Sequence, residues 1–205
     1  MSIIKLNNNG VKNATAFGSG VTSLGSMTFI KKLTASGAST LTFHDGSSDV
    51  VLDNTYKEYI FTFNNIHTGT DSGKFQFQGN AAGGADFNET MVSTYFHAQH
   101  NQAGSFTRLG YRTAHDNVGT GFTMFTEGGT AENERSVSGY LHLFNPSSTT
   151  FVKHFTAVTN NAQSDDYCTT VYIAGYFNTT SAIDEIRFQE STGTFDGDIC
   201  LYGIA

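Results

Sequence analysis

The stretch VSGYLHLFNPSSTTFVKHFTAVT constrains the fold most strongly, because its side chains alternate in character on both sides of a turn. Leu141 and Leu143 fall on one face of the first half, whereas Tyr140 and His142 fall on the other. This is the two-residue period of a pleated strand. The stretch therefore predicts an extended segment with bulky side chains on both of its faces.

The second half of the stretch repeats the pattern after a turn. Phe155 and Ala157 share one face, and His154 and Val158 share the other. Pro146, the only proline in the chain, lies between the two halves. Proline fixes φ and lacks an N–H donor, so it favours a turn over the interior of a paired strand. We expect a hairpin whose strands are covered on both sides.

The rest of the chain has the same character. It contains 22 Gly, 18 Phe and 9 Tyr in 205 residues, a composition that favours strands and turns over helices. Within residues 74–78, for example, Phe75 and Phe77 are expected to point inward, and Gln76 and Gln78 outward to water. Besides the hairpin, extended patterns occur at residues 27–31, 40–43, 56–64, 74–78, 91–99, 109–112, 122–125, 170–177, 183–189 and 198–204.

These ten to twelve short strands at regular spacing, with no credible amphipathic helix, predict an all-β fold. We expect a two-sheet antiparallel β-sandwich, jelly-roll-like, that forms a single domain over residues 26–205. The polar loop at residues 79–89 and the turn-rich stretches at 115–121 and 127–135 are expected on the surface.

Residues 1–25 differ from the rest, because a short apolar start is followed by a passage rich in Gly and Ser without sustained periodicity. They are expected to form an N-terminal arm. One interpretation is a loosely ordered terminus, and the other is an attachment device in which Ile3, Ile4 and Leu6 dock onto a neighbouring subunit or a larger assembly.

Charge and apolar patterning exclude several classes of protein. The net charge is −7, and the longest basic run is the pair Lys31 and Lys32, so we expect no binding of nucleic acid. No run of 18 apolar residues predicts a membrane span, and the start is too short for a secretory signal. A product of a reducing cytoplasm would keep Cys168 and Cys200 unpaired, the alternative being one cross-strand disulfide.

Five segments resemble a known group of proteins: IIKLNN, TYKEYIFTFNNIH, GYLHLFNPSSTTFVKHF, IAGYFNTTSAI and LYGI. Across nearly the whole chain, they are similar to virion-associated structural proteins of marine tailed bacteriophages, including cyanophages. The resemblance implies a structural part of the virion, on the tail or fibre or as a decoration of the capsid surface. It implies contacts with other virion proteins and no catalytic residues or cofactors. Together with the many Phe residues, it also predicts a homotrimer.

Histidine and acidic residues are candidates for a metal site. His97 and His100 are three positions apart, which on a strand places them on opposite faces, so no metal site is expected there. His142 and His154 lie in facing strands and are either cross-strand partners or separate hydrogen-bonded side chains. The turn that begins at Asp45 lacks the ligand spacing of a Ca²⁺ loop.

Enzymatic activity is not expected. Asp184 and Glu185 are the nearest match to the paired carboxylates of sandwich-fold glycosidases, but adjacent strand residues face opposite ways. No nucleophile elbow, phosphate-binding loop or CxxC motif is present.

Carbohydrate binding is the alternative to a purely structural role, as in a receptor-recognition module for polysaccharide on the host surface. Sandwich lectins bind sugars on loops with aromatic rings, and the tyrosines near polar loops are Tyr95, Tyr111 and Tyr167. These rings either contact a glycan or pack at the rim of a sheet or a subunit interface.

Overall fold

The computed structural model describes residues 27–163 and 166–204. The attachment arm with Ile3, Ile4 and Leu6 therefore lies outside the described residues, and its role stays a prediction. The described residues form thirteen strands and one short 3-10 helix, η1 (Thr113–His115). The strands are β1 (Met27–Ala38), β2 (Thr40–His44), β3 (Glu58–Thr68), β4 (Phe75–Ala81), β5 (Met91–Asn101), β6 (Thr107–Tyr111), β7 (Val118–Gly119), β8 (Thr123–Met124), β9 (Val137–Phe144), β10 (Lys153–Ala162), β11 (Tyr167–Phe177), β12 (Ile183–Glu190) and β13 (Phe195–Ile204).

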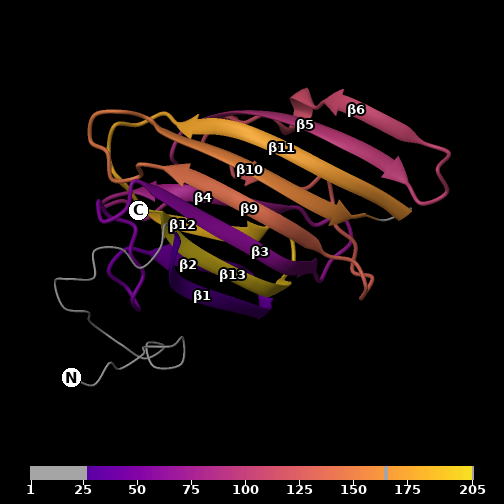
Figure 1. Cartoon of the computed structure of the whole chain (residues 1–205), viewed down its shortest axis with the longest axis horizontal. Helices are drawn as coiled ribbons and strands as arrows, with labels where there is room; N and C mark the ends of the chain where they lie inside the picture. The colour runs from indigo at the N-terminus through magenta and orange to yellow at the C-terminus, as the bar shows by residue number, and fades with distance from the viewer. Residues whose placement is uncertain (1–26, 164–165, 205) are drawn as a thin grey trace, which may run out of the picture.

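Two sheets pack face to face, and this confirms the prediction of an all-β antiparallel sandwich. The larger sheet has nine strands in the order β1-β13-β3-β9-β10-β11-β5-β6, with β7 paired to β5, and the smaller has the order β2-β12-β4-β8. Figure 1 shows the larger sheet as a broad layer with β12 and β4 behind it. A jelly roll in its simplest form has eight strands, and the additional strands here lie in the larger sheet.

Phenylalanine rings fill the space between the sheets. Phe61 and Phe63 point inward from β3, and Phe188 meets them from β12 at centroid distances of 5.3 and 5.4 Å. Phe75 and Phe77 of β4 complete this cluster, and all five rings are buried. The alternation in the sequence therefore predicts correctly which side chains of these strands form the core.

The prediction that Gln76 and Gln78 point outward to water is wrong. Both side chains of β4 are buried, because loops cover the second face of the smaller sheet. The amide of Gln78 donates to the backbone oxygens of Glu89, Thr120 and Gly121 at 3.0 to 3.1 Å.

In the hairpin of β9 and β10, a face that was predicted to be covered is exposed instead. Its inner face is buried, but Tyr140, His154 and Thr156 on the outer face are exposed. The prediction that both faces are covered is therefore wrong for the described part of the chain.

The two cysteines are unpaired, as expected. Cys168 lies on β11 and Cys200 on β13, and β3, β9 and β10 separate these strands in the larger sheet. Such a separation exceeds the reach of a disulfide. None of the described residues forms a helix of the length and apolarity that a membrane crossing requires.

Candidate functional site

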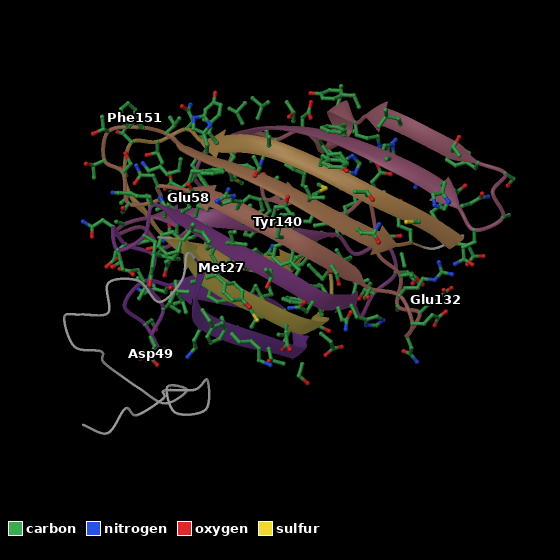
Figure 2. The ribbon with its side chains drawn as sticks, in the orientation of Figure 1. Met27, Asp49, Glu58, Glu132, Tyr140 and Phe151 are labelled. Atoms are coloured by element: carbon green, nitrogen blue, oxygen red, sulfur yellow. The ribbon has the colours of Figure 1, made fainter. Side chains whose placement is uncertain are left out.

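A row of large side chains crosses the outer face of the larger sheet. In the register of five adjacent strands, Tyr140 lies opposite Val158, Val158 opposite Tyr172, Tyr172 opposite Phe96, and Phe96 opposite Tyr111. The rings of Phe96 and Tyr172 stack at 4.9 Å and 8°. Tyr172 is 39% exposed and Phe96 is 42% exposed. We call this row of five residues the aromatic ridge. Figure 2 shows Tyr140 on this face, together with Met27 and Glu58.

A shallow hollow of about 320 Å³ runs beside the ridge. Its floor is the neighbouring cross-strand row, in which Thr156 lies opposite Ala174 and Ala174 opposite Thr94. His154 and Tyr176 border it on the far side. Small side chains thus alternate with large ones along β10, β11 and β5, which gives the outer face relief as well as apolar character.

Charged groups keep to the border of this face. The carboxylate of Glu58 lies 2.9 Å from His142 Nε2, and Lys32 Nζ lies 3.1 Å from the Asp198 carboxylate. The residues of the ridge and the floor of the hollow are uncharged. The outer face could therefore be buried against another surface without placing an unpaired charge in a contact.

A second feature lies on the inner side of the larger sheet, where the smaller sheet does not reach. Residues 112–119 run along β5, and residues 125–128 lie against β10. Arg112 donates its backbone N–H to the oxygen of Tyr95 at 3.0 Å, and the amide of Asn161 donates to the oxygen of Gly128 at 2.9 Å. Phe125, in the stretch 122–125 predicted to be extended, is fully buried, and Thr130, in a stretch expected on the surface, is buried as well.

Two charged residues of this part of the chain, Glu127 and Arg112, form a cluster with His97 of β5. Oε1 of Glu127 lies 2.8 Å from Nδ1 of His97 and 2.6 Å from Nε of Arg112. The His97 side chain has no exposed surface, and burial lowers its pKa although Glu127 opposes the shift. His97 is therefore neutral at neutral pH. Burial also lowers the pKa of His115, whose ring lies 4.9 Å from that of Tyr95.

The cluster opens into a pocket of about 320 Å³, which we call the polar pocket. The side chains that line it include two cations, one carboxylate, two amides, a hydroxyl and a tyrosine, contributed by Lys74, Arg112, Glu127, Gln99, Gln163, Ser72 and Tyr167. The amide of Gln99 donates to Gln163 Oε1 at 2.9 Å and to Thr169 Oγ1 at 3.0 Å. The pocket thus presents donors and acceptors whose positions are fixed by the fold.

The three tyrosines proposed as glycan contacts have different surroundings. Tyr95 is fully buried, so the prediction that it contacts a glycan is wrong: its place on β5 turns it inward with His97. Tyr111 lies on the aromatic ridge and donates its hydroxyl to Asp116 at 2.6 Å. Tyr167 lies at the polar pocket. Tyr111 aligns with Phe96 of β5 and Tyr167 with Asn101, so the two do not share a site.

The other lining residues were missed by sequence reasoning. Glu127 lies in a polar loop and Arg112 at the end of a predicted strand, and only folding brings them beside His97. Lys74 begins the predicted strand 74–78, and nothing in that pattern links it to a site. The one usable signal was an aromatic residue next to polar loops, which selected Tyr167.

The candidate metal ligands are separated as expected. His97 is buried and His100 is exposed on the opposite face. His154 aligns with Tyr176, and His142 aligns with Thr156, so the two histidines are not direct partners. Within residues 27–163 and 166–204, no group of three His, Cys, Asp or Glu side chains could hold a metal ion.

The remaining acidic candidates have local partners. Asp45 accepts the backbone N–H of Leu52 at 2.8 Å and thereby closes its turn. Glu185 contacts His44 and accepts the amide of Asn80 at 2.8 Å. These contacts give both carboxylates a role in holding loops and strands together.

Comparisons with protein-family models, with curated proteins and with solved structures find no match to this chain.

Proposed function

We propose that this protein is a non-enzymatic structural component of a tailed-phage virion, which assembles through contacts with copies of itself and with other virion proteins. The observation that carries the proposal is the aromatic ridge beside its hollow on the outer face of the larger sheet. Contiguous exposed apolar surface of this kind marks a site of protein association. The resemblance of five sequence segments to virion proteins supplies the link to a phage particle.

The relief of the face favours a second copy as the partner. Two identical surfaces related by a two-fold axis meet the same patch on each other. In such a pair, the ridge with Tyr172 and Phe96 can enter the partner's hollow over Ala174, and the reverse contact forms at the same time. A surface that carries both a projection and a matching depression is complementary to itself.

The size of the face is adequate for a stable contact. Eight strands in one path, spaced about 4.8 Å apart, give a width of about 34 Å. A standard interface buries about 800 Å² on each partner. A face about 34 Å wide reaches this area when about seven residues of each strand, at about 3.4 Å per residue, take part. The homotrimer expected from the resemblance stays a prediction, because the face by itself favours pairs.

Sedimentation velocity at micromolar concentration tests the association. We expect the wild-type chain to sediment as an oligomer and Tyr172→Lys to weaken its association by at least about 30-fold, since loss of a central tyrosine costs about 2 kcal/mol or more. Phe151→Lys is the control, because Phe151 is 70% exposed in the loop between β9 and β10, outside the ridge. A monomeric wild-type chain, or equal association of both variants, would contradict the proposal.

The arm gives a separate prediction about attachment to the particle. Deleting residues 2–24 is expected to leave a folded domain, because the described core is formed by later residues. The truncated protein should no longer join the particle, as measured by its recovery with purified virions. Normal incorporation would end the attachment hypothesis.

A further inference from the structure

We propose that the polar pocket binds a carboxylate-bearing sugar, a hexuronate unit of an acidic polysaccharide. The pocket is on the inner side of the larger sheet, away from the aromatic ridge, so this inference does not depend on self-association. It extends the proposed function from assembly to recognition of a ligand. Four features of the pocket support it: its excess of positive charge, its fixed hydroxyl partners, its tyrosine and its volume.

The charge of the pocket favours an anion with a single charge. Lys74 and Arg112 contribute two positive charges, Glu127 contributes one negative charge, and His97 is neutral, which leaves a net charge of +1. No acidic group of the described residues lies within ion-pair distance of Lys74. The chain as a whole carries −7, so the pocket is a local exception. A carboxylate neutralises this excess, whereas a dianionic phosphate would leave the pocket with a net charge of −1.

Arg112 is oriented to bind such a carboxylate. Its Nε lies 2.6 Å from Glu127, and its side chain remains 31% exposed at the pocket. The terminal nitrogens of a guanidinium held in this way present a pair of parallel donors, the geometry that suits a carboxylate. Nδ1 of His97 lies 2.8 Å from the same oxygen of Glu127, so Oε1 contacts both side chains. Arg112 is therefore positioned before any ligand arrives.

The remaining polar groups match the hydroxyls of a sugar. The amides of Gln99 and Gln163 are held by their mutual hydrogen bond and by Thr169, and Ser72 adds a hydroxyl. Amide groups can donate to and accept from neighbouring hydroxyls, and a carboxylate can accept from them. A polyhydroxylated acid can add hydrogen bonds to these groups through its hydroxyls, whereas a plain carboxylate such as acetate has no hydroxyl to do so.

Tyr167 and the volume of the pocket limit the ligand to one ring. The Tyr167 ring packs edge-on against Phe106 at 5.4 Å, which holds it at the rim. Its ring can cover the apolar face of a sugar. The volume of about 320 Å³ is at the low end for small-molecule sites. A single saccharide unit fits such a space, and a protein segment does not.

A matched pair of ligands tests the inference directly. Methyl glucuronide and methyl glucoside differ only in a carboxylate in place of a hydroxymethyl group, and calorimetric or NMR titration measures both against the full chain. We expect the glucuronide to bind about 10-fold tighter or more, the usual gain of a charge-assisted hydrogen bond. Equal affinities, no binding of either sugar, or tighter binding of inorganic phosphate than of the glucuronide would overturn the inference.

Two variants locate the site. Lys74→Gln should remove most of the preference for the glucuronide, whereas Lys57→Gln, the same charge change at an exposed residue away from the pocket, should keep it. Tyr167→Ala should weaken both sugars alike, because it removes the ring and not the charge. Thermal unfolding of each variant confirms that it is folded. An unchanged preference in folded Lys74→Gln would place the binding elsewhere and contradict the assignment.

Discussion

Phe188→Ala is expected to lower the free energy of unfolding by about 3–5 kcal/mol, the cost of deleting a fully buried ring. Phe188 joins the two sheets, since its ring lies 5.3 Å from Phe61, 5.4 Å from Phe63 and 6.0 Å from Phe75. The cavity left behind is lined by these rigid rings, which cannot collapse to fill it. For a chain of this size, about 4 kcal/mol corresponds to a fall in Tm of about 8–16 °C.

Thermal or denaturant unfolding followed by circular dichroism measures this change. Phe151→Ala is the matched control, because it deletes the same ring at a site that is 70% exposed, and it should change stability by less than about 0.5 kcal/mol. Similar losses in the two variants would mean that the ring cluster does not hold the sheets together.

Glu190→Gln is expected to stabilise the protein at neutral pH. Glu190 ends β12, it is 6% exposed, and its Oε2 has no hydrogen-bond partner among the described residues. Burial raises the pKa of this carboxyl to about 8. The ordinary pKa of a glutamate is about 4.5, and below this pH the carboxyl is protonated in both states and does not lower the stability. The free energy of unfolding then falls as the pH rises from about 4.5 toward about 8.

The size of the effect follows from the pKa shift. At pH 7, the raised pKa of this carboxyl lowers the free energy of unfolding of the wild-type chain by on the order of 3 kcal/mol. Glu190→Gln removes that loss. Unfolding measured at pH 4 and pH 7 should therefore show a gain for the variant only at the higher pH. Glu134→Gln, at an exposed glutamate, should leave the profile unchanged. Parallel profiles for wild type and Glu190→Gln would show that the carboxyl is solvated or paired.

Alternation along single strands was enough to predict the sandwich and much of its core. Tyr59, Phe61 and Phe63 share a parity in the sequence and a buried face in the structure, as do Ile186 and Phe188. The physical reason is local: on a pleated strand, the face of a side chain depends only on its position. The pairing order of the strands has no such local signal, because it joins β1 to β13 across most of the chain.

What covers the second face of a strand could not be predicted in the same way. Gln76 and Gln78 are polar, yet loops from distant parts of the chain bury them and bond to their side chains. On β9, Tyr140 is aromatic, yet no described segment covers it. Polarity predicts burial only when the neighbouring layer is known, and that layer comes from tertiary structure.

The polar pocket was beyond sequence reasoning for the same reason. Its charged residues are Lys74, which immediately precedes β4, and Arg112 and Glu127, which follow β6. Only folding brings Glu127 within 2.6 Å of Arg112. Tyr167 was found because it borders a polar loop, whereas Tyr95 was wrongly chosen by the same rule. The rule does not distinguish the two faces of a strand, and Tyr95 is on the inner one.

A density map of the intact phage particle tests the central claim most directly. The account predicts that several copies of this sandwich are resolved in the virion, with the outer faces of their larger sheets, including Tyr140, Tyr172 and Phe96, covered by a neighbouring copy. A particle that lacks the protein, or one in which these faces meet only solvent, would contradict it.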